Sequence, residues 1–420
     1  MATFEYDPFS AEAMADPHLF YPTLRDRHPV LRLDAYHGWA ISRFEDCWQI
    51  LQDHERFSVV EGPVFVRELL AEPFEPGAIP SAEAHRSFST WDAPAHTRIR
   101  RALIPRFAPR AIASWEAEMR RLARTSLGEL MPRQAFDVVG DLAGPHGLAN
   151  IARVLGLELD DLPALFKQVQ RSTARVPGVP GFTESGMAEQ ASIVERIVAA
   201  VARRRAERPA GRDDVLDVLL RFEHDGTPLS DVDVATQLFT LLLGGAETFP
   251  KVIAGGLLEL ARAPEQWQAL TRDPSLIPSA FEEMMRHQGV LQHVGRTALE
   301  DVEIGGETIR RGDRVFVLLQ SANRDEREFR EADRFDVRRA PSRSLALGVG
   351  RHHCIGSHLA RLEGRVLLET FVDMVASYQV VGMDDLRPSP SEFQVGYTRM
   401  PIEVIARPSS DSPQSGEKTP

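Results

Sequence analysis

The sequence predicts a mainly α-helical fold with a smaller β-rich part, because helical and strand periods occupy different stretches of the 420 residues. Apolar residues recur at three- and four-residue steps through most of 112–225 and again through 230–262. Alternating residues flank glycine-containing turns in 29–41 and 301–320, which is typical of β-strands. With 43% hydrophobic residues, the chain can build a large core.

The composition argues against several classes of partner and compartment. A formal net charge of −12 makes nucleic acid an unexpected partner. Two cysteines cannot form a disulfide framework, so we expect a reducing, cytoplasmic setting. The acidic N-terminus lacks the features of a signal peptide, and the sequence contains no run of 18 apolar residues. We therefore expect no membrane association.

The N-terminal third combines short elements with one long loop. Residues 1–15 read as an arm, 29–41 as a hairpin, and 44–54 as a short helix in which Cys47 packs in the core. Residues 56–91 are rich in Pro, Gly and Ser and have no sustained period. Loops of this length often carry function.

A basic segment follows this loop. His96 and Arg100 are four residues apart, so on a helix they share a face and together can bind a carboxylate. Arg98 and Arg101 are expected on a solvated face. Helical periods then cover 114–131, 141–155, 160–173, 187–208 and 215–223, and a cluster of Pro and Gly residues interrupts them at 176–186.

A long helix is expected from Ser230 to about Arg262, which corresponds to ~48 Å. Its centre contains Gly244, Gly245 and Pro250, and such residues cost about 1 to 3 kcal/mol each inside a helix. Rule-breaking at the centre of an apolar helix indicates function. The adjacent Glu247 and Thr248 would place an acid and a hydroxyl at a locally opened groove. The alternative is a kink tolerated for packing, with Glu247 in a salt bridge.

Residues 344–363 contain Cys354 among glycines and basic residues. Neighbouring positive charge and the start of a helix favour a thiolate, so the residues favour a thiolate ligand on a loop. A nucleophilic cysteine, a zinc ligand and a buried inert cysteine are the alternatives. No Asn or Asp stands nearby to orient a base, and Cys47 lacks zinc-site spacing. An inert cysteine leaves the glycines unexplained.

The pattern Leu347-Gly348-x-Gly350-x-His352-x-Cys354-x-Gly356 resembles the haem-binding loop of the cytochrome P450 family. The resemblance extends over residues 16–407 and implies that family's fold, with a long central helix and a cysteine-ligand loop enclosing haem b. It leaves 408–420 as a disordered tail. By resemblance, Cys354 is the thiolate ligand of the haem iron. Two departures are Leu347, where the family has an aromatic residue, and Ser344, where a His is common.

The resemblance also assigns roles elsewhere in the chain. Glu247 and Thr248 match the family's acid–alcohol pair, which relays protons to iron-bound dioxygen, although Phe249-Pro250 departs from the usual pattern. The pair Glu283 and Arg286, with Arg338 or Arg334, matches a structural network. The remaining cofactor-site residues are the expected propionate ligands His96, Arg100, Arg296 and His352, the loop residues Leu347, Gly348 and Gly356, and Gly244 and Gly245, which would make room for O2.

The activity implied is monooxygenation of a hydrophobic small molecule, with O2 as oxidant and electrons from a separate ferredoxin and its reductase. A peroxygenase that uses hydrogen peroxide, a haem-based binding or sensor protein without turnover, and a cysteine hydrolase remain the alternatives. A basic surface for ferredoxin is expected at Arg98, Arg101, Arg106, Arg110, Arg351 and Arg361. Substrate-pocket candidates are Val64, Phe65, Leu69, Leu70, Phe74, Phe88, Leu291, Gln292, His293 and Tyr397.

Overall fold

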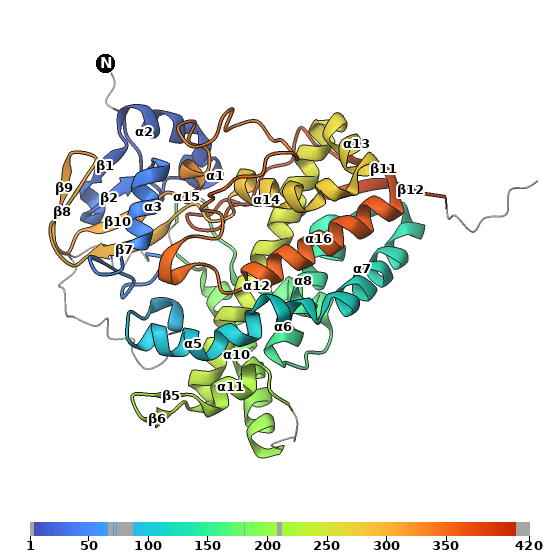
Figure 1. Ribbon diagram of the computed structural model, residues 1–420, viewed down its shortest axis with the longest axis horizontal. Coiled ribbons are helices and arrows are strands. Elements are labelled where there is room, and N and C mark those ends of the chain that lie inside the picture. The colour runs from blue at the N-terminus through green and yellow to red at the C-terminus, as the bar shows by residue number, and fades with distance from the viewer. Residues whose placement is uncertain are drawn as a thin grey trace, which may run out of the picture.

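The computed structural model describes residues 4–65, 70, 73, 87–179, 181–207 and 212–408. The pocket candidates Leu69 and Phe74 lie outside the described residues. Within them the fold is mainly helical with smaller sheets, as predicted (Figure 1). The α-helices are α1 (Ala11–Ala15), α2 (Tyr21–Arg27), α3 (Phe44–Gln52), α5 (Ala95–Phe107), α6 (Pro109–Ala113), α7 (Glu116–Leu130), α8 (Gly144–Leu155), α9 (Leu162–Ser172), α10 (Glu184–Glu207), α11 (Val215–Arg221), α12 (Asp231–Arg262), α13 (Pro264–Arg272), α14 (Ile277–Gln288), α15 (Leu319–Ala322) and α16 (Ser357–Met374).

The strands form one larger and several small sheets. In the larger sheet the order is β1-β2-β10-β7-β3, with β2 and β10 parallel and the other neighbours antiparallel. A second sheet has the order β11-β12-β4, and β5-β6 and β8-β9 are hairpins. The strands are β1 (Val30–Leu33), β2 (Gly38–Ile41), β3 (Phe57–Ser58), β4 (Ala135–Asp137), β5 (Glu223–His224), β6 (Thr227–Pro228), β7 (Val294–Ala298), β8 (Val302–Ile304), β9 (Glu307–Ile309), β10 (Arg314–Val317), β11 (Val375–Val380) and β12 (Pro401–Ala406).

Helix α12 organises the helical part. Its N-terminus is fixed by a capping box, in which Ser230 and Asp233 each bond the other's backbone N–H at 3.1 Å. The helix continues through Pro250 and contacts α8, α9, α10, α14 and α16. It is long and apolar enough to cross a bilayer by length and composition, but 78% of its most apolar window is buried, as in the core helix of a globular protein.

The two parts of the molecule have separate apolar cores. The main core joins α5–α14, α16 and the β11-β12-β4 sheet, whereas two further clusters lie in and around the larger sheet (Figure 1). Cys47 is fully buried in one of these, in agreement with its expected packing role. Residues expected as an N-terminal arm are also packed, since Tyr6 and Phe9 are buried against the sheet core.

Several boundaries differ from the sequence prediction for physical reasons. The 29–41 hairpin forms, but its left-handed residue is His37, because Gly38 lies within β2 where a Cβ would lie 2.6 Å from the Arg314 carbonyl oxygen. The stretch before β12 forms isolated bridges, Leu291 with Gln394 and Ser389 with Gly396, and no regular strand. The hairpin β5-β6 was not predicted.

Candidate functional site

The cysteine loop is a tight turn that precedes α16. Gly348 and Gly350 have positive φ values of 66° and 76°, which favour glycine. At Gly350 a Cβ would lie 2.4 Å from the carbonyl oxygen of Leu51, so this loop is pressed against the end of α3. The N–H of Cys354 donates to the Leu347 carbonyl at 2.9 Å, which fixes the cysteine one turn before the helix.

The sulfur of Cys354 is accessible, although it lies deep in the protein. The residue is exposed, yet burial raises the pKa of its thiol. A hydrogen bond from the Gly356 backbone and the charges of Arg100 and Arg361 only partly oppose this shift. The neighbouring positive charge does favour the thiolate, as expected, but desolvation is the larger effect and the net shift of the pKa is upward.

Four basic side chains converge near this loop. The rings of His96 and His352 stack with centroids 3.9 Å apart, and Nε2 of His96 is buried without a hydrogen-bond partner. Arg296 is buried and donates to the Gly295 carbonyl at 2.7 Å, while Arg100 donates to the His353 carbonyl at 2.8 Å. Among the described residues, neither arginine forms an ion pair.

Electrostatics marks this set as a site for an anion. Burial lowers the pKa of His96 to about 4 and of Arg296 to about 10. Burial, followed by the neighbouring basic groups, lowers the pKa of His352 to about 2. Buried cations are expensive unless they are paired. Arg100 and Arg296 are the charged members of this set, whereas the two histidines are neutral near pH 7 at these pKa values and can donate a ring N–H. The arrangement therefore suits a ligand that brings carboxylates to these four side chains, which we call the cation cluster (His96, Arg100, Arg296 and His352).

The centre of α12 presents two different faces. Gly244 is exposed, whereas Leu243 and Gly245 beside it are half-buried, and a Cβ at Gly244 would meet nothing within 4 Å. The Thr248 hydroxyl lies on this face and donates to the Gly244 carbonyl at 2.7 Å. At Gly245, by contrast, a Cβ would lie 2.8 Å from Ile151 of α8. Gly245 therefore permits close helix packing and opens no space for O2, unlike our expectation.

Glu247 points away from the open face. It is 7% exposed, and its Oε1 accepts hydrogen bonds from Thr173 Oγ1 at 2.6 Å and Lys251 Nζ at 2.7 Å. The side-chain amide of Gln394, with its nitrogen toward Glu247, donates to Oε2 at 2.8 Å. The salt bridge that the sequence left open is thus present. Sequence reasoning missed Lys251, although its i, i+4 spacing from Glu247 is a signal for this pair.

Three of the pocket candidates have structural roles. Gln292 is fully buried and donates to the carbonyls of Ala13 and Ser391. Phe65 is packed on Phe316, with ring centroids 4.9 Å apart. Its ring would clash with any side chain at Gly295.

Tyr397 directs its hydroxyl toward Arg262, the last residue of α12, and so away from the centre of that helix. These three assignments to the pocket are corrected.

The other candidates are divided. His293 is fully buried against Phe316 without hydrogen-bond partners, and burial lowers its pKa to about 4. Phe88 and Leu70 are buried in apolar cores. Val64 and Leu291 are half-buried, and their pocket role stays a prediction.

The Glu283–Arg286 network is complete but has a different third member. Arg286 and Glu283 are fully buried and form two hydrogen bonds, at 2.7 and 2.8 Å. The third member is Arg339, whose Nε lies 3.1 Å from Glu283. Arg334 contributes only its backbone carbonyl, and Arg338 is exposed.

Comparison with known proteins identifies the family. The sequence model described as "Cytochrome P450" matches residues 275–394. The protein named "Putative cytochrome P450 123" of Mycobacterium tuberculosis is 30% identical over 404 residues, which cover 96% of this chain and 97% of the relative. The chain belongs to the cytochrome P450 family.

Further relatives and solved structures agree with this assignment. Cytochrome P450 107B1 of Saccharopolyspora erythraea is 31% identical to this P450, and the match covers 92% of this chain and 95% of the relative. The structure of CYP109Q5 from Chondromyces apiculatus superposes with a TM-score of 0.80 at 28% identity, covering 96% of this chain and 98% of the other. The enzyme is thus a haem b-containing monooxygenase that uses O2, a hydrophobic substrate and redox partners.

The residues present fit haem b. The accessible sulfur of Cys354 offers a metal ligand, the cation cluster offers partners for two propionates, and Gly244 borders open space in the centre of α12. When bound, the haem supplies an iron that activates dioxygen.

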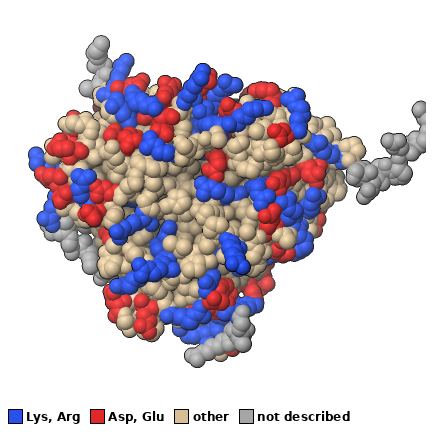
Figure 2. All heavy atoms as spheres, in the orientation of Figure 1, with Lys and Arg blue, Asp and Glu red and all other residues tan. Residues whose placement is uncertain are grey.

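The P450's surface over the cysteine helix is less basic than the sequence suggested. Arg98, Arg106 and Arg361 form ion pairs with Asp225, Asp213 and Glu282. Arg101, Arg110 and Arg351 are exposed and form no ion pair with any described residue. Figure 2 shows a broad uncharged area at the centre of this face, with basic side chains beside it.

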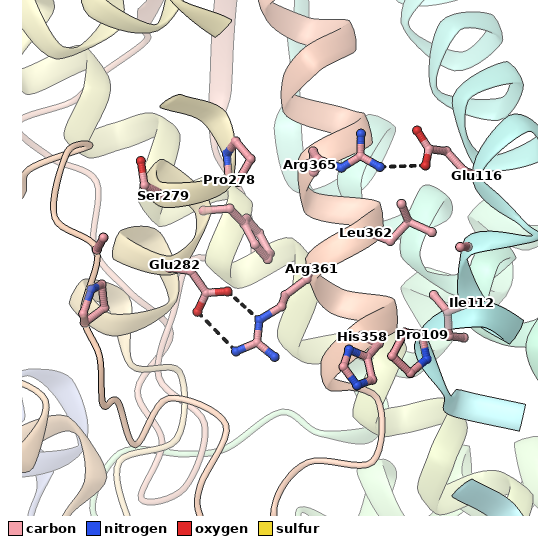
Figure 3. A pocket seen from close by; sticks show the side chains of 14 residues that line it. Pro109, Ile112, Glu116, Pro278, Ser279, Glu282, His358, Arg361, Leu362 and Arg365 are labelled. Carbon is pink, nitrogen blue, oxygen red and sulfur yellow. Dashed lines mark hydrogen bonds and ion pairs between the residues drawn. The ribbon is translucent and has the colours of Figure 1, made fainter. Parts of the chain in front are cut away.

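A groove of about 550 Å³ lies between α6, α14 and α16 on the P450 (Figure 3). Pro109, Ile112 and Leu362 give it apolar walls. The ion pairs of Arg361 with Glu282 and of Arg365 with Glu116 border it.

Proposed function

We propose that this P450 inserts one oxygen atom of O2 into a bulky hydrophobic metabolite, with electrons supplied by a ferredoxin and its reductase. The observation that carries the proposal is the accessible Cys354 near four buried or half-buried basic side chains that form no ion pair with any described acidic residue. The second oxygen atom leaves as water after two electrons and two protons have been added.

The proposed roles follow from side-chain chemistry. Cys354 is the thiolate ligand of the iron, since a coordinated thiol loses its proton whatever its pKa in the unligated protein. The cation cluster holds the propionates by charge-assisted hydrogen bonds. Thr248, on the open face of α12, holds a proton near the oxygen site through its hydroxyl, and Glu247 supplies protons to that side of the helix.

The substrate proposal is drawn from relatives. One is named "Epothilone C/D epoxidase" of Sorangium cellulosum, at 32% identity over 87% of this chain, and another "Steroid C26-monooxygenase" of Mycobacterium tuberculosis, at 32% over 76%. The enzyme of the structure with erythromycin B is 28% identical. These compounds are large and mostly apolar, which supports a polyketide-like or steroid-like substrate for this enzyme.

The electron donor is proposed from surface charge. Arg101, Arg110 and Arg351 are exposed cations on the cysteine side of the protein and can steer an acidic ferredoxin. The docking set is therefore smaller than the six arginines suggested by the sequence. We propose that the protein acts in the cytoplasm, without a membrane or nucleic-acid partner.

The thiolate assignment is tested by the reduced, carbon-monoxide-bound absorption spectrum. Wild-type protein should give the band that names the family, and Cys354→Ser should abolish it while Cys47→Ser retains it. An unchanged band in Cys354→Ser would disprove the assignment. Optical difference spectra with a polyketide and steroid collection then test the substrate class. Turnover with peroxide but none with ferredoxin, reductase and O2 would favour the peroxygenase alternative.

A further inference from the structure

The carboxylate of Glu247 is held by three donors from three parts of the chain. Lys251 lies one turn later on α12, Thr173 caps the C-terminus of α9, and Gln394 belongs to the turn that leads to β12. Lys251 and Glu247 have side-chain exposures of only 6% and 9%. We call these four residues the Glu247 cluster. Each carboxylate oxygen accepts at least one hydrogen bond, so these three donors fix the orientation of the side chain.

The cluster separates Glu247 from Thr248. Consecutive residues of a helix point about 100° apart, whereas residues four apart share a face. Thr248 therefore lies with Gly244 on the open face, and Glu247 lies with Lys251 on the face toward α9 and the 389–396 turn. The Thr248 hydroxyl donates to a backbone carbonyl and not to Glu247. The acid and the alcohol do not meet in this conformation.

Packing fixes the lysine in this position. At Gly396 a Cβ would lie 2.8 Å from Cβ of Lys251, so the turn backbone lies directly on the lysine stem. The ammonium group is also 3.4 Å from the Gln394 carbonyl oxygen. A buried cation with this little freedom can act as a fixed counter-ion for Glu247.

The cluster is also tied to the segment that follows α9. Arg175, two residues after Thr173, forms a buried ion pair with Glu392 at 2.8 Å, and its guanidinium lies 3.9 Å from the ring centroid of Phe182. This segment connects α9 with α10, and we call its described residues, 173–179 and 181–183, the lid segment. Its side chains Val176, Val179 and Phe182 are exposed. Movement of the segment would withdraw Thr173 from Glu247.

We propose that Lys251 is a positioning residue for oxygen activation. It holds the Glu247 carboxylate on the lid side of α12, and the Thr173 contact makes release of that carboxylate depend on the lid segment. Glu247 reaches the Thr248 side of the helix only after this hold is released. The inference rests on the proposed proton role of Glu247, and it adds a residue that the acid–alcohol pattern does not include.

The test compares haem-loaded Lys251→Met, Lys251→Arg and Thr173→Val with wild type. Met retains the aliphatic stem without the charge, Arg retains the charge, and Val retains the shape of Thr without the hydroxyl. The matched control is Arg205→Met, which breaks a half-exposed ion pair with Asp231 at the start of the same helix. An unchanged carbon-monoxide spectrum establishes that each variant has an intact haem site.

Two readouts separate positioning from folding. In difference infrared spectra, Lys251→Met should gain a protonated-carboxyl band that disappears when Glu247→Gln is added, because the buried carboxylate has lost its cation. During turnover, the share of electrons released as hydrogen peroxide should rise at least twofold in Lys251→Met and less in Thr173→Val. Arg205→Met should match wild type in both readouts, and Lys251→Arg, which retains the charge, should lie closer to wild type than Lys251→Met.

The variants distinguish failure of the Lys251 positioning role from failure of the proposed proton role of Glu247. If Glu247→Gln leaves the rate and solvent isotope effect of turnover unchanged, Glu247 has no proton role and the proposed function is wrong at that residue. If Glu247→Gln slows turnover but Lys251→Met and Thr173→Val match Arg205→Met, the positioning role is overturned. Should Lys251→Met fail to fold, Thr173→Val alone decides, with the same peroxide readout.

Discussion

Two buried arginines of this P450 show how pairing separates folding from ligand binding. Arg286 is fully buried and bonds both oxygens of Glu283 and the carbonyls of Asn323 and Ala332. Arg296 is 6% exposed, yet among the described residues its guanidinium bonds only the Gly295 carbonyl, and burial lowers its pKa. The first arginine is satisfied by the protein itself. The second, with the rest of the cation cluster, is left for an anion that the chain does not provide.

The largest effect is expected at the paired arginine. Arg286→Leu leaves the buried Glu283 with Arg339 as its remaining charged partner and removes the donor to two carbonyls, which should lower the free energy of unfolding by about 3 kcal/mol. Urea unfolding and soluble yield measure this change. The exposed Arg338→Leu is the control and should change stability by less than about 0.5 kcal/mol. Equal stabilities of the two variants would contradict the distinction.

A buried base can also avoid the cost of charge by staying neutral, as His293 does. Burial lowers its pKa to about 4, whereas an exposed histidine titrates near about 6.5. The unfolded chain therefore binds more protons, and stability falls as the pH decreases from about 6.5 through about 4, by up to about 3 kcal/mol. His293→Leu should flatten this part of the stability–pH curve, measured by urea unfolding. The exposed His54→Leu should leave it unchanged.

Replacing the unpaired arginine should affect the cofactor and spare the fold. Arg296→Leu removes a charged donor to a propionate, which should weaken haem retention by about 1.5–3 kcal/mol, or about tenfold or more. The apoprotein should be no less stable, because a buried unpaired cation is lost. Haem transfer to a scavenging protein and unfolding of the apoprotein measure the two quantities. The exposed Arg311→Leu serves as the control, and a destabilised apoprotein with normal haem retention would reverse the assignment.

The smallest effect is expected for the surface arginines, where one that is paired can again be compared with one that is not. Arg101 is exposed without an ion pair among the described residues, whereas Arg98 is paired with Asp225. Arg101→Ala should slow ferredoxin association a few-fold at low ionic strength and lose this effect at high salt. Arg98→Ala should have a smaller effect. Stopped-flow reduction of the haem provides the rate, and identical salt dependence for the two variants would argue against the narrowed docking set.

The sequence predicts most of the elements because their patterns are local. The long apolar helix of 231–262 has its capping box at Ser230, and the Cys354 loop has glycines at two positions with positive φ. The β5-β6 hairpin, which the sequence analysis did not predict, also has a local turn signal in the sequence. Asp225-Gly226 is a favoured two-residue turn, and both residues have positive φ.

Contacts between distant segments could not be predicted in the same way. Glu247 contacts Thr173 and Gln394 only in the folded chain. Gln292 donates hydrogen bonds to the carbonyls of Ala13 and Ser391 and does not line a pocket. Local charge suggested a thiolate at Cys354, but desolvation depends on the surrounding fold and has the opposite effect. Residue type thus indicates the possible chemistry, and the neighbours decide which group is available for it.

The helical part and the sheet part both contribute to the cation cluster. Arg296 comes from β7 of the sheet part, whereas His96 and Arg100 come from α5 of the helical part. One porphyrin held by all three would act as a brace between these two parts, whose apolar cores are separate. Thermal melting should therefore be a single cooperative transition in holoprotein and split into two in its absence, so that haem supply governs how the chain survives heat.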